Sequence, residues 1–118
     1  MRAAVVTKPG GPEVFEVVER EDPVPGPDEV LIAVKASALN RADLAQRRGG
    51  YPAPAGTAPD IPGLEMAGIV IDVGGRVTTV KEGQRVFGLI GGGGYATRVA
   101  THERMLIPIP EGMSFEEA

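Results

Sequence analysis

The chain has 118 residues, of which 42% are hydrophobic, and its 12 basic and 16 acidic residues give a net charge of −4. At this length about 65% of the surface of the unfolded chain can be buried, so we expect one globular domain with a hydrophobic core. The acidic balance excludes a nucleic-acid-binding protein, which needs a basic patch to meet phosphate. Without cysteine the chain forms neither disulfides nor thiolate zinc sites.

The compartment is predicted from what the sequence lacks. No apolar run approaches the ~20 residues of a membrane span. The N-terminal sequence has no apolar region of the kind that a signal peptide requires. We therefore expect a cytoplasmic protein that binds neither a membrane nor a nucleic acid.

Short segments rich in β-branched residues, separated by glycine and proline, predict a mainly β fold. Strands are expected over residues 3–6, 14–19, 29–39, 66–74, 85–90, 95–100 and 104–110. Strands do not alternate with long helices, which excludes a doubly wound α/β sheet and indicates a β-barrel or sandwich.

A helix is expected over residues 40–48, between the third and fourth of these strands. Asn40 is a favoured N-cap residue, and Asp43 follows three positions later, as in a capping box. Gly49 is expected to end this helix.

A second helix is indicated over residues 113–118, where Ser114 and Glu117 have the spacing of a capping box. A single helical turn does not offset the cost of its own nucleation. We therefore expect the chain to be the front domain of a longer protein, with this helix leading toward the next domain.

Four consecutive glycines, Gly91 to Gly94, precede Tyr95 and Ala96 and formally match the G-x-G-x-x-G/A pattern of a dinucleotide-binding turn. Such a turn needs a following helix to meet the pyrophosphate, whereas the residues that follow here are alternating and β-branched. No acidic ribose ligand follows within a βαβ unit. We interpret the glycines as a hairpin connection or a site of close backbone approach.

Three segments of the chain are typical of one family: "MRAAVVTKPGGPEVFEV", "VLIAVKASALNRADLAQRRGGYPAPAGTAPDIPGLEMAGIV" and "VKEGQRVFGLIGGGGYAT". Through these segments the chain resembles the zinc-independent quinone oxidoreductases of the medium-chain dehydrogenase/reductase superfamily, in particular the zeta-crystallin and p53-inducible types. The similarity extends over the whole chain, from Met1 to Ala118.

This resemblance implies that residues 1–118 form the GroES-like catalytic domain, a partly open β-barrel with short helices. It implies a nicotinamide-binding Rossmann domain that follows these residues and carries the glycine fingerprint. The expected reaction is hydride transfer from NADPH, bound mainly by that second domain, to a quinone or an activated enone. Such proteins are commonly homodimers, and we expect the 118 residues alone to be inactive.

The resemblance also implies that no metal is bound. Zinc alcohol dehydrogenases of the same superfamily have a cysteine ligand near the position of Asn40, and Gly-His-Glu where this chain has Gly63-Leu64-Glu65. Neither Asn40 nor Leu64 is a suitable ligand for a catalytic zinc, which needs three good donors. Polarisation of a substrate carbonyl must then come from hydrogen-bond donors or from an electrophilic substrate.

Tyr51 is the expected catalytic residue, and Asn40 and Tyr51 are the expected cofactor contacts. Their sequence positions alone indicate a helix cap and an exposed loop tyrosine between Gly50 and Pro52. The resemblance places both side chains in the cleft near the nicotinamide, where the phenol would donate to a developing oxyanion. Some bacterial relatives have a second tyrosine six residues before this one, where the chain has Ala45.

Three further side chains have simpler expected roles. Glu65 is interpreted either as half of a salt bridge or as a cleft carboxylate. His102 is expected in an exposed loop, and Arg47 at a solvated helix end. The arginines that could pair with Glu65 are Arg41, Arg85 and Arg104.

Three alternative functions stay open. The chain could belong to an enoyl-thioester reductase of the same superfamily, which shares the fold and the cofactor. It could be a stand-alone GroES-like binding module without catalysis. It could also have a structural role, as crystallin relatives of this family do.

Overall fold

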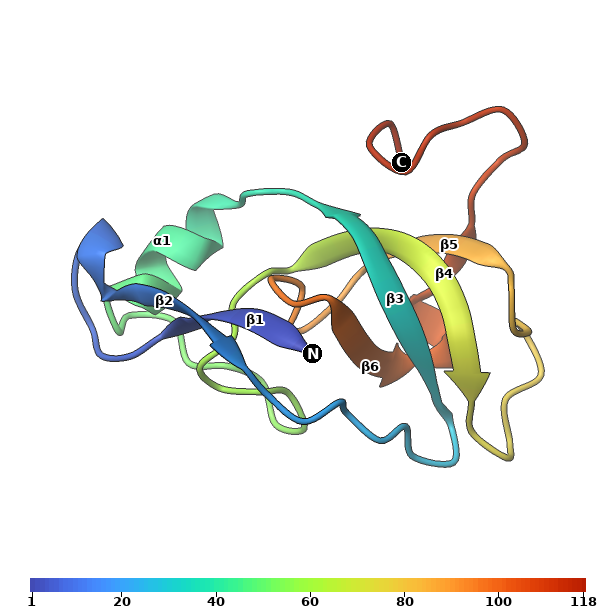
Figure 1. Ribbon diagram of the computed structural model, residues 1–118, viewed down its shortest axis with the longest axis horizontal. Coiled ribbons are helices and arrows are strands. Elements are labelled where there is room, and N and C mark those ends of the chain that lie inside the picture. The colour runs from blue at the N-terminus through green and yellow to red at the C-terminus, as the bar shows by residue number, and fades with distance from the viewer.

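The computed structural model describes residues 1–118 and contains two antiparallel sheets (Figure 1). The larger sheet has the strand order β6-β3-β4-β5-β7, and the smaller pairs β1 with β2. Since β6 and β7 are unpaired edges, the larger sheet is open rather than a closed barrel. The strands are β1 (Arg2–Val6), β2 (Phe15–Glu19), β3 (Glu29–Ser37), β4 (Glu65–Val73), β5 (Arg85–Leu89), β6 (Arg98–His102) and β7 (Ile107–Pro108).

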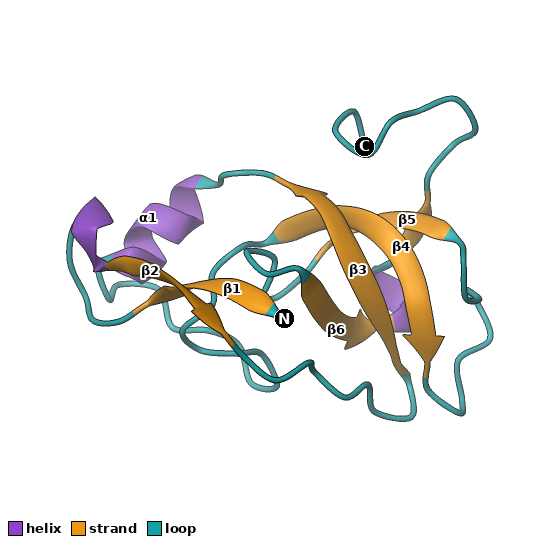
Figure 2. Ribbon diagram, viewed as in Figure 1, coloured by secondary structure: helices purple, strands orange, loops and turns teal.

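Helical structure is limited to three short elements (Figure 2). The α-helix α1 (Arg41–Arg47) follows β3 and lies beside the smaller sheet, since the Gly10 N–H donates to the Arg47 carbonyl at 3.0 Å. The 3-10 helices are η1 (Pro12–Val14) and η2 (Glu103–Met105). None of these helices is long and apolar enough to cross a membrane.

The hydrophobic core lies on the larger sheet and is built from β-branched side chains. Ile32 on β3 is opposite Val70 on β4 and opposite Val99 on β6, and all three are buried. A smaller cluster of Ala3 and Val5 with Ile61 joins the first strand to the segment that precedes β4. The main cluster is Val30, Ile32, Met66, Val70, Val80, Val86, Ile90, Val99 and Leu106.

Gly68 allows β3 and β4 to approach closely. A Cβ atom at this position would lie 2.2 Å from the Ala33 carbonyl oxygen, which is closer than any ordinary contact. Gly68 pairs with Val34 in the β3–β4 ladder, next to a bulge between Val34 and Ala36. Only a glycine fits this close approach of the two backbones.

The buried carboxylate of Glu103 fixes the loop between β4 and β5. Its Oε1 accepts from the N–H groups of Thr78 and Thr79, both at 3.0 Å, and from the Thr79 hydroxyl at 2.7 Å. These bonds favour the ionised form, so the pKa of Glu103 lies below its ordinary value, with the Thr78 N–H as the largest cause.

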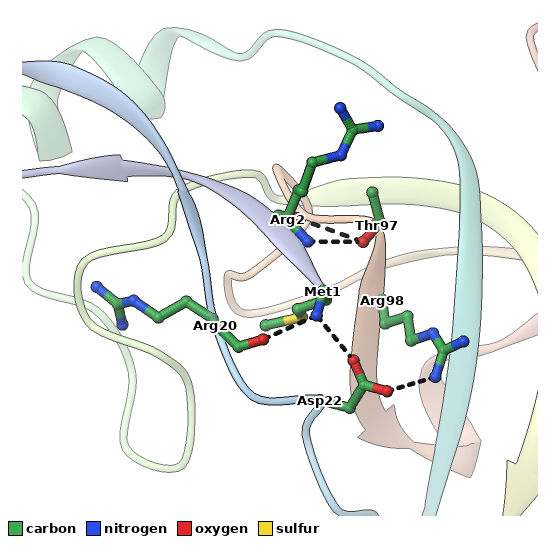
Figure 3. A network of polar contacts seen from close by, with 6 residues as sticks. All are labelled: Met1, Arg2, Arg20, Asp22, Thr97 and Arg98. Atoms are coloured by element: carbon green, nitrogen blue, oxygen red, sulfur yellow. Dashed lines mark hydrogen bonds and ion pairs between the residues drawn. The ribbon is translucent and has the colours of Figure 1, made fainter.

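A polar network at the N-terminus connects the smaller sheet to β6 (Figure 3). The Met1 ammonium donates to Asp22 Oδ1 at 3.0 Å and to the Arg20 carbonyl at 2.8 Å. Asp22 also pairs with Arg98 through its other oxygen. The ammonium hydrogen bond is the largest of the effects that hold the pKa of Asp22 below its ordinary value.

The predicted mainly β architecture is confirmed, with two corrections at its C-terminal end. The strand predicted over 104–110 is wrong, because residues 103–105 form η2 and only Ile107–Pro108 pairs as β7. His102 Nδ1 accepts from the Arg104 N–H at 3.1 Å and so starts this turn. The helix predicted over 113–118 is a single turn, although Ser114 and Glu117 do form the expected reciprocal bonds at 3.1 Å.

The sixth predicted strand begins later than expected. It was placed over 95–100, whereas β6 covers Arg98–His102. Tyr95 instead directs its N–H to the Pro62 carbonyl at 3.0 Å. The segment that precedes β6 is thereby held against the segment that precedes β4.

Candidate functional site

Asn40 stands where β3 gives way to α1 and occupies the predicted N-cap position. Its backbone is extended, with φ −121° and ψ 152°. Asp43 is the N3 residue of a capping box, and its Oδ2 accepts from the Asn40 N–H at 2.8 Å. This bond satisfies a backbone donor at the start of the helix and fixes where the Asn40 side chain emerges.

The side-chain amide of Asn40 is bound to Glu65 at the start of β4. Asn40 Nδ2 donates to Glu65 Oε2 at 2.9 Å, and both residues are half-buried. The predicted salt bridge of Glu65 with Arg41, Arg85 or Arg104 is wrong, because the ion pairs of the structure do not include Glu65. Arg85 instead donates to the Met113 carbonyl at 2.6 Å and stacks over Phe115.

Tyr95, in the segment between β5 and β6, completes this group of polar residues. Its hydroxyl donates to Asp43 Oδ2 at 2.5 Å, and Asp43 itself is only 5% exposed. Burial is the largest cause that raises the pKa of Tyr95 well above its ordinary value, followed by the hydrogen bond to Asp43 and the charges of Asp43 and Glu65. Tyr95 is thus a neutral donor and a poor acid.

Together, the four residues are joined by hydrogen bonds, in which Asp43 binds the Asn40 backbone N–H and Glu65 binds the Asn40 side chain. This network runs from Tyr95 through Asp43 and Asn40 to Glu65, across residues that come from three separate stretches of sequence. The second oxygen of Asp43, Oδ1, is buried and has no hydrogen-bond partner. A buried carboxylate with a free oxygen is costly, so the bonds to its other oxygen are the ones that hold it in place.

The glycine run places the Tyr95 hydroxyl at this site. Gly92 and Gly93 have φ values of 151° and 86°, which favour glycine. Gly94 donates its N–H to the Gly63 carbonyl at 3.0 Å, and a Cβ at Gly63 would lie 2.6 Å from the Tyr95 nitrogen. The interpretation of the run as a close backbone approach is confirmed, and β6 rather than a helix follows it.

A cavity of about 430 Å³ lies along α1, from the N-cap residue Asn40 to the last residue Arg47. Its size suits part of a small-molecule ligand. Asn40, Asp43 and Tyr95 contribute its polar atoms beside apolar and cationic side chains. Leu39, at 86% exposure, presents an apolar surface next to Asn40. The lining residues are Phe15, Leu39, Asn40, Arg41, Asp43, Leu44, Arg47 and Tyr95.

Tyr51 lies after α1, in the loop that Gly49 and Gly50 begin. Gly50 donates its N–H to the Ala45 carbonyl at 2.8 Å, which turns the chain at the end of the helix. Tyr51 is 36% exposed and is not among the residues that line the cavity beside Asn40. The structure therefore does not bring the two predicted cofactor contacts together, and the role of Tyr51 stays a prediction.

Two other predicted positions are corrected. Arg47 is half-buried rather than solvated, because its Nε donates to the Gly10 carbonyl at 3.1 Å. His102 is exposed as expected, but it is the last residue of β6 rather than a loop residue.

Comparison with known proteins gives the family. The model of the alcohol dehydrogenase GroES-like domain matches residues 26–111, which is more than half of the chain. The chain belongs to the alcohol dehydrogenase GroES-like domain family. This GroES-like domain is similar to quinone oxidoreductases of the medium-chain dehydrogenase/reductase superfamily. The family resemblance seen in the sequence is therefore confirmed.

Two solved structures share the fold closely. A quinone oxidoreductase of Pseudomonas syringae pv. Tomato DC3000 is 38% identical with a TM-score of 0.92, over 99% of this chain and 36% of that one. The Escherichia coli quinone oxidoreductase complexed with NADPH is 32% identical with a TM-score of 0.89, over 98% and 35% of the two chains.

The GroES-like domain also resembles a trans-enoyl reductase of Aspergillus flavipes, at 40% identity over 98% of this chain and 36% of the relative. The 118 residues thus span about a third of the length of these relatives. The relatives named here are oxidoreductases of two kinds, quinone oxidoreductases and an enoyl reductase.

The sequence indicated Asn40 and Asp43 but did not indicate Tyr95, which contacts them in the structure. Asn40 was predicted, and Asp43 was identified as its capping partner. Tyr95 was read only as part of a strand, since nothing local connects it to a residue 52 positions earlier. The four glycines directly before it were the available signal, because such a run permits a close backbone approach that delivers the next side chain.

Proposed function

We propose that this GroES-like domain forms the catalytic wall of an NADPH-dependent oxidoreductase that reduces a quinone or an activated enone. The observation that carries the proposal is the fixed Asn40 amide on a cavity of about 430 Å³. The similarity to quinone oxidoreductases, one of them complexed with NADPH, supports the cofactor and the substrate class.

The cavity fits the reactive end of such a cofactor, whereas the glycine run does not fit its diphosphate. The cavity combines exposed Leu39 with the amide of Asn40, as a planar carboxamide-bearing ring requires. The glycine run is used for packing against Gly63 and leaves no helix N-terminus for a diphosphate. We therefore propose that a Rossmann domain following residue 118 holds most of NADPH.

When bound, NADPH supplies the hydride. Asn40 orients the ligand, and the exposed side chains of Leu39 and Leu44 offer it an apolar contact. The raised pKa of Tyr95 makes it a poor source of a proton. Tyr95 instead positions α1 through its hydrogen bond to Asp43. We propose that Tyr51 donates a hydrogen bond to the oxygen that becomes negative on the substrate.

Zinc takes no part in this proposal. The structure contains no group of three or more histidine, cysteine, aspartate or glutamate side chains that could hold a metal ion. The independence from zinc, a homodimeric full-length protein and a cytoplasmic location remain predictions. Activity after treatment with a chelator, size-exclusion chromatography and fractionation of cells test them in turn.

Reduction of an enoyl thioester is the second candidate. The trans-enoyl reductase similarity, at 40% identity over nearly the whole chain, favours it. It uses the same fixed Asn40 and the same cofactor.

Steady-state assays of the full-length gene product separate the two candidates. NADPH oxidation is followed with a quinone, a simple enone and an enoyl thioester as acceptors. We expect the highest kcat/KM with the quinone or the enone. A strong preference for the thioester would favour the second candidate, and the lack of turnover with any acceptor would exclude both.

The same assay tests Tyr51. Tyr51→Phe removes only the hydroxyl, and loss of a useful oxyanion donor lowers kcat/KM by on the order of 10². An unchanged kcat/KM for the preferred acceptor would remove Tyr51 from the mechanism without touching the proposed reaction.

A further inference from the structure

The hydrogen bond between Asn40 and Glu65 has a fixed polarity. Glu65 Oε2 lies 2.9 Å from Asn40 Nδ2, and an ionised carboxylate can only accept hydrogen bonds. The nitrogen end of the amide must therefore face Glu65, and the carbonyl Oδ1 forms the opposite end. We propose that Glu65 is a positioning residue, which binds the Asn40 amide nitrogen so that the oxygen, which faces the Asp43 N–H in the capping box, keeps its second acceptor position for a ligand.

The surroundings make this orientation rigid. Glu65 is the first residue of β4, which pairs with β3 on one side and β5 on the other. The backbone of Asn40 is held separately, through the bond from its N–H to Asp43 Oδ2 at 2.8 Å. Asn40 is thus fixed at both its backbone and its side chain, as a preorganised ligand contact requires.

A carboxylate at position 65 has a cost, because it has no cationic partner, and a benefit, because it fixes the orientation of the Asn40 amide. Glu65 is half-buried and takes no part in the four ion pairs of the structure. A half-buried carboxylate without a cationic partner is costly. A glutamine would avoid that cost, but it could bond to Asn40 through either its oxygen or its nitrogen. Only the carboxylate leaves the Asn40 amide a single orientation.

A fixed acceptor selects the chemistry of its ligand. The Asn40 oxygen favours a group with an N–H or O–H donor and disfavours a group that only accepts. In the proposed function, on which this inference rests, the carboxamide and hydroxyl groups of NADPH are such donors. Glu65 would then contribute to cofactor binding without touching the cofactor.

Exchanging the amide at position 40 with the carboxylate at position 65 tests the proposal in the full-length gene product. Asn40→Asp places two carboxylates together, and Glu65→Gln removes the fixed polarity. In the double variant the glutamine amide can donate to the new aspartate, whose second oxygen remains an acceptor for the ligand. Glu82→Gln, at an exposed turn position, is the matched control.

We expect the Kd of NADPH to rise about tenfold in Asn40→Asp and to return to within about threefold of the wild type in the double variant. The control should leave this Kd unchanged. A double variant that binds NADPH no more tightly than Asn40→Asp would overturn the positioning role. Thermal unfolding of each variant identifies any that fails to fold.

A second measurement needs no cofactor. In the NMR spectrum of the 118-residue chain, the two Nδ2 protons of Asn40 should be widely separated and should converge in Glu65→Gln. Identical Asn40 signals in both proteins would overturn the inference. The expected Asn40 signals in a full-length protein that binds no NADPH would support the orientation by Glu65 and overturn the proposed function instead.

Discussion

The Tyr95 hydroxyl donates to Asp43 Oδ2 at 2.5 Å and so ties the glycine run to the helix that begins at Asn40. The two residues are separated by 52 positions in sequence. Without this bond, Asp43 Oδ2 keeps only the Asn40 N–H as a donor, while Asp43 Oδ1 is buried without a partner. The position of the Asn40 backbone therefore depends on a tyrosine that is distant in sequence.

Tyr95→Phe should destabilise the chain by about 1–2 kcal/mol, because it removes a hydrogen bond to a buried carboxylate and leaves that group less satisfied. Denaturant unfolding followed by circular dichroism measures the change. Tyr51→Phe is the matched control and should stay within about 0.5 kcal/mol of the wild type. Equal stabilities of all three proteins would show that the bond to Asp43 contributes nothing.

The pKa of Tyr95 is raised above its ordinary value of about 10, so we expect the stability of the protein to depend on pH in the alkaline range. The folded state holds the phenol proton more tightly than the unfolded state, so stability is complete below pH ~10 and falls as the pH rises above it. In Tyr51→Phe the remaining tyrosine is Tyr95. Its tyrosinate absorbance should appear only well above pH ~10 or together with unfolding. Ionisation of Tyr95 near pH 10 in the folded protein would contradict the environment described.

Glu103→Gln should lower the melting temperature at neutral pH, because the carboxylate accepts three hydrogen bonds from Thr78 and Thr79. The pKa of Glu103 is lowered in the folded state, so its contribution is present above the ordinary pKa and is lost as the pH falls through the folded value. The gap in melting temperature between wild type and variant should therefore narrow toward pH ~3. A constant gap across this range would be inconsistent with the role of the carboxylate charge, and Glu82→Gln serves as the control.

Gly68→Ala tests the close approach of β3 and β4. The added Cβ would lie 2.2 Å from the Ala33 carbonyl oxygen, so the strands must separate. We expect a loss of at least about 3 kcal/mol or a failure to fold. Gly75→Ala meets no atom within 4 Å and should change the stability by less than about 0.5 kcal/mol. Similar stabilities of the two variants would refute the packing.

Much of the fold follows from local patterns. The β-branched residues around Ile32 and Val70 predicted β3 and β4, and Asn40 with Asp43 predicted α1. The pattern failed at residues 104–110, where an apolar composition indicated a strand. There Pro108 and Pro110 lack the N–H groups that a ladder needs, and η2 turns the chain first.

The N-cap position of Asn40 was predictable from the sequence, whereas the partner of its side chain was not. The partner of Glu65 is an amide rather than an arginine, because the start of β4 meets the start of α1 and not a cationic side chain. This contact depends on the topology of the sheet, which cannot be predicted from the local sequence around either residue. The same is true of Tyr95 and Asp43, whereas the glycine run was correctly taken as a packing feature.

The most direct test of the account is the binding of NADPH to the full-length gene product with and without the Asn40 amide. Asn40→Ala should raise the Kd of NADPH about tenfold and should also lower quinone-dependent turnover. Arg48→Ala, at an exposed residue beyond α1, should change neither. An unchanged Kd and turnover in Asn40→Ala would contradict the claim that this domain contributes the cofactor-facing wall of the enzyme.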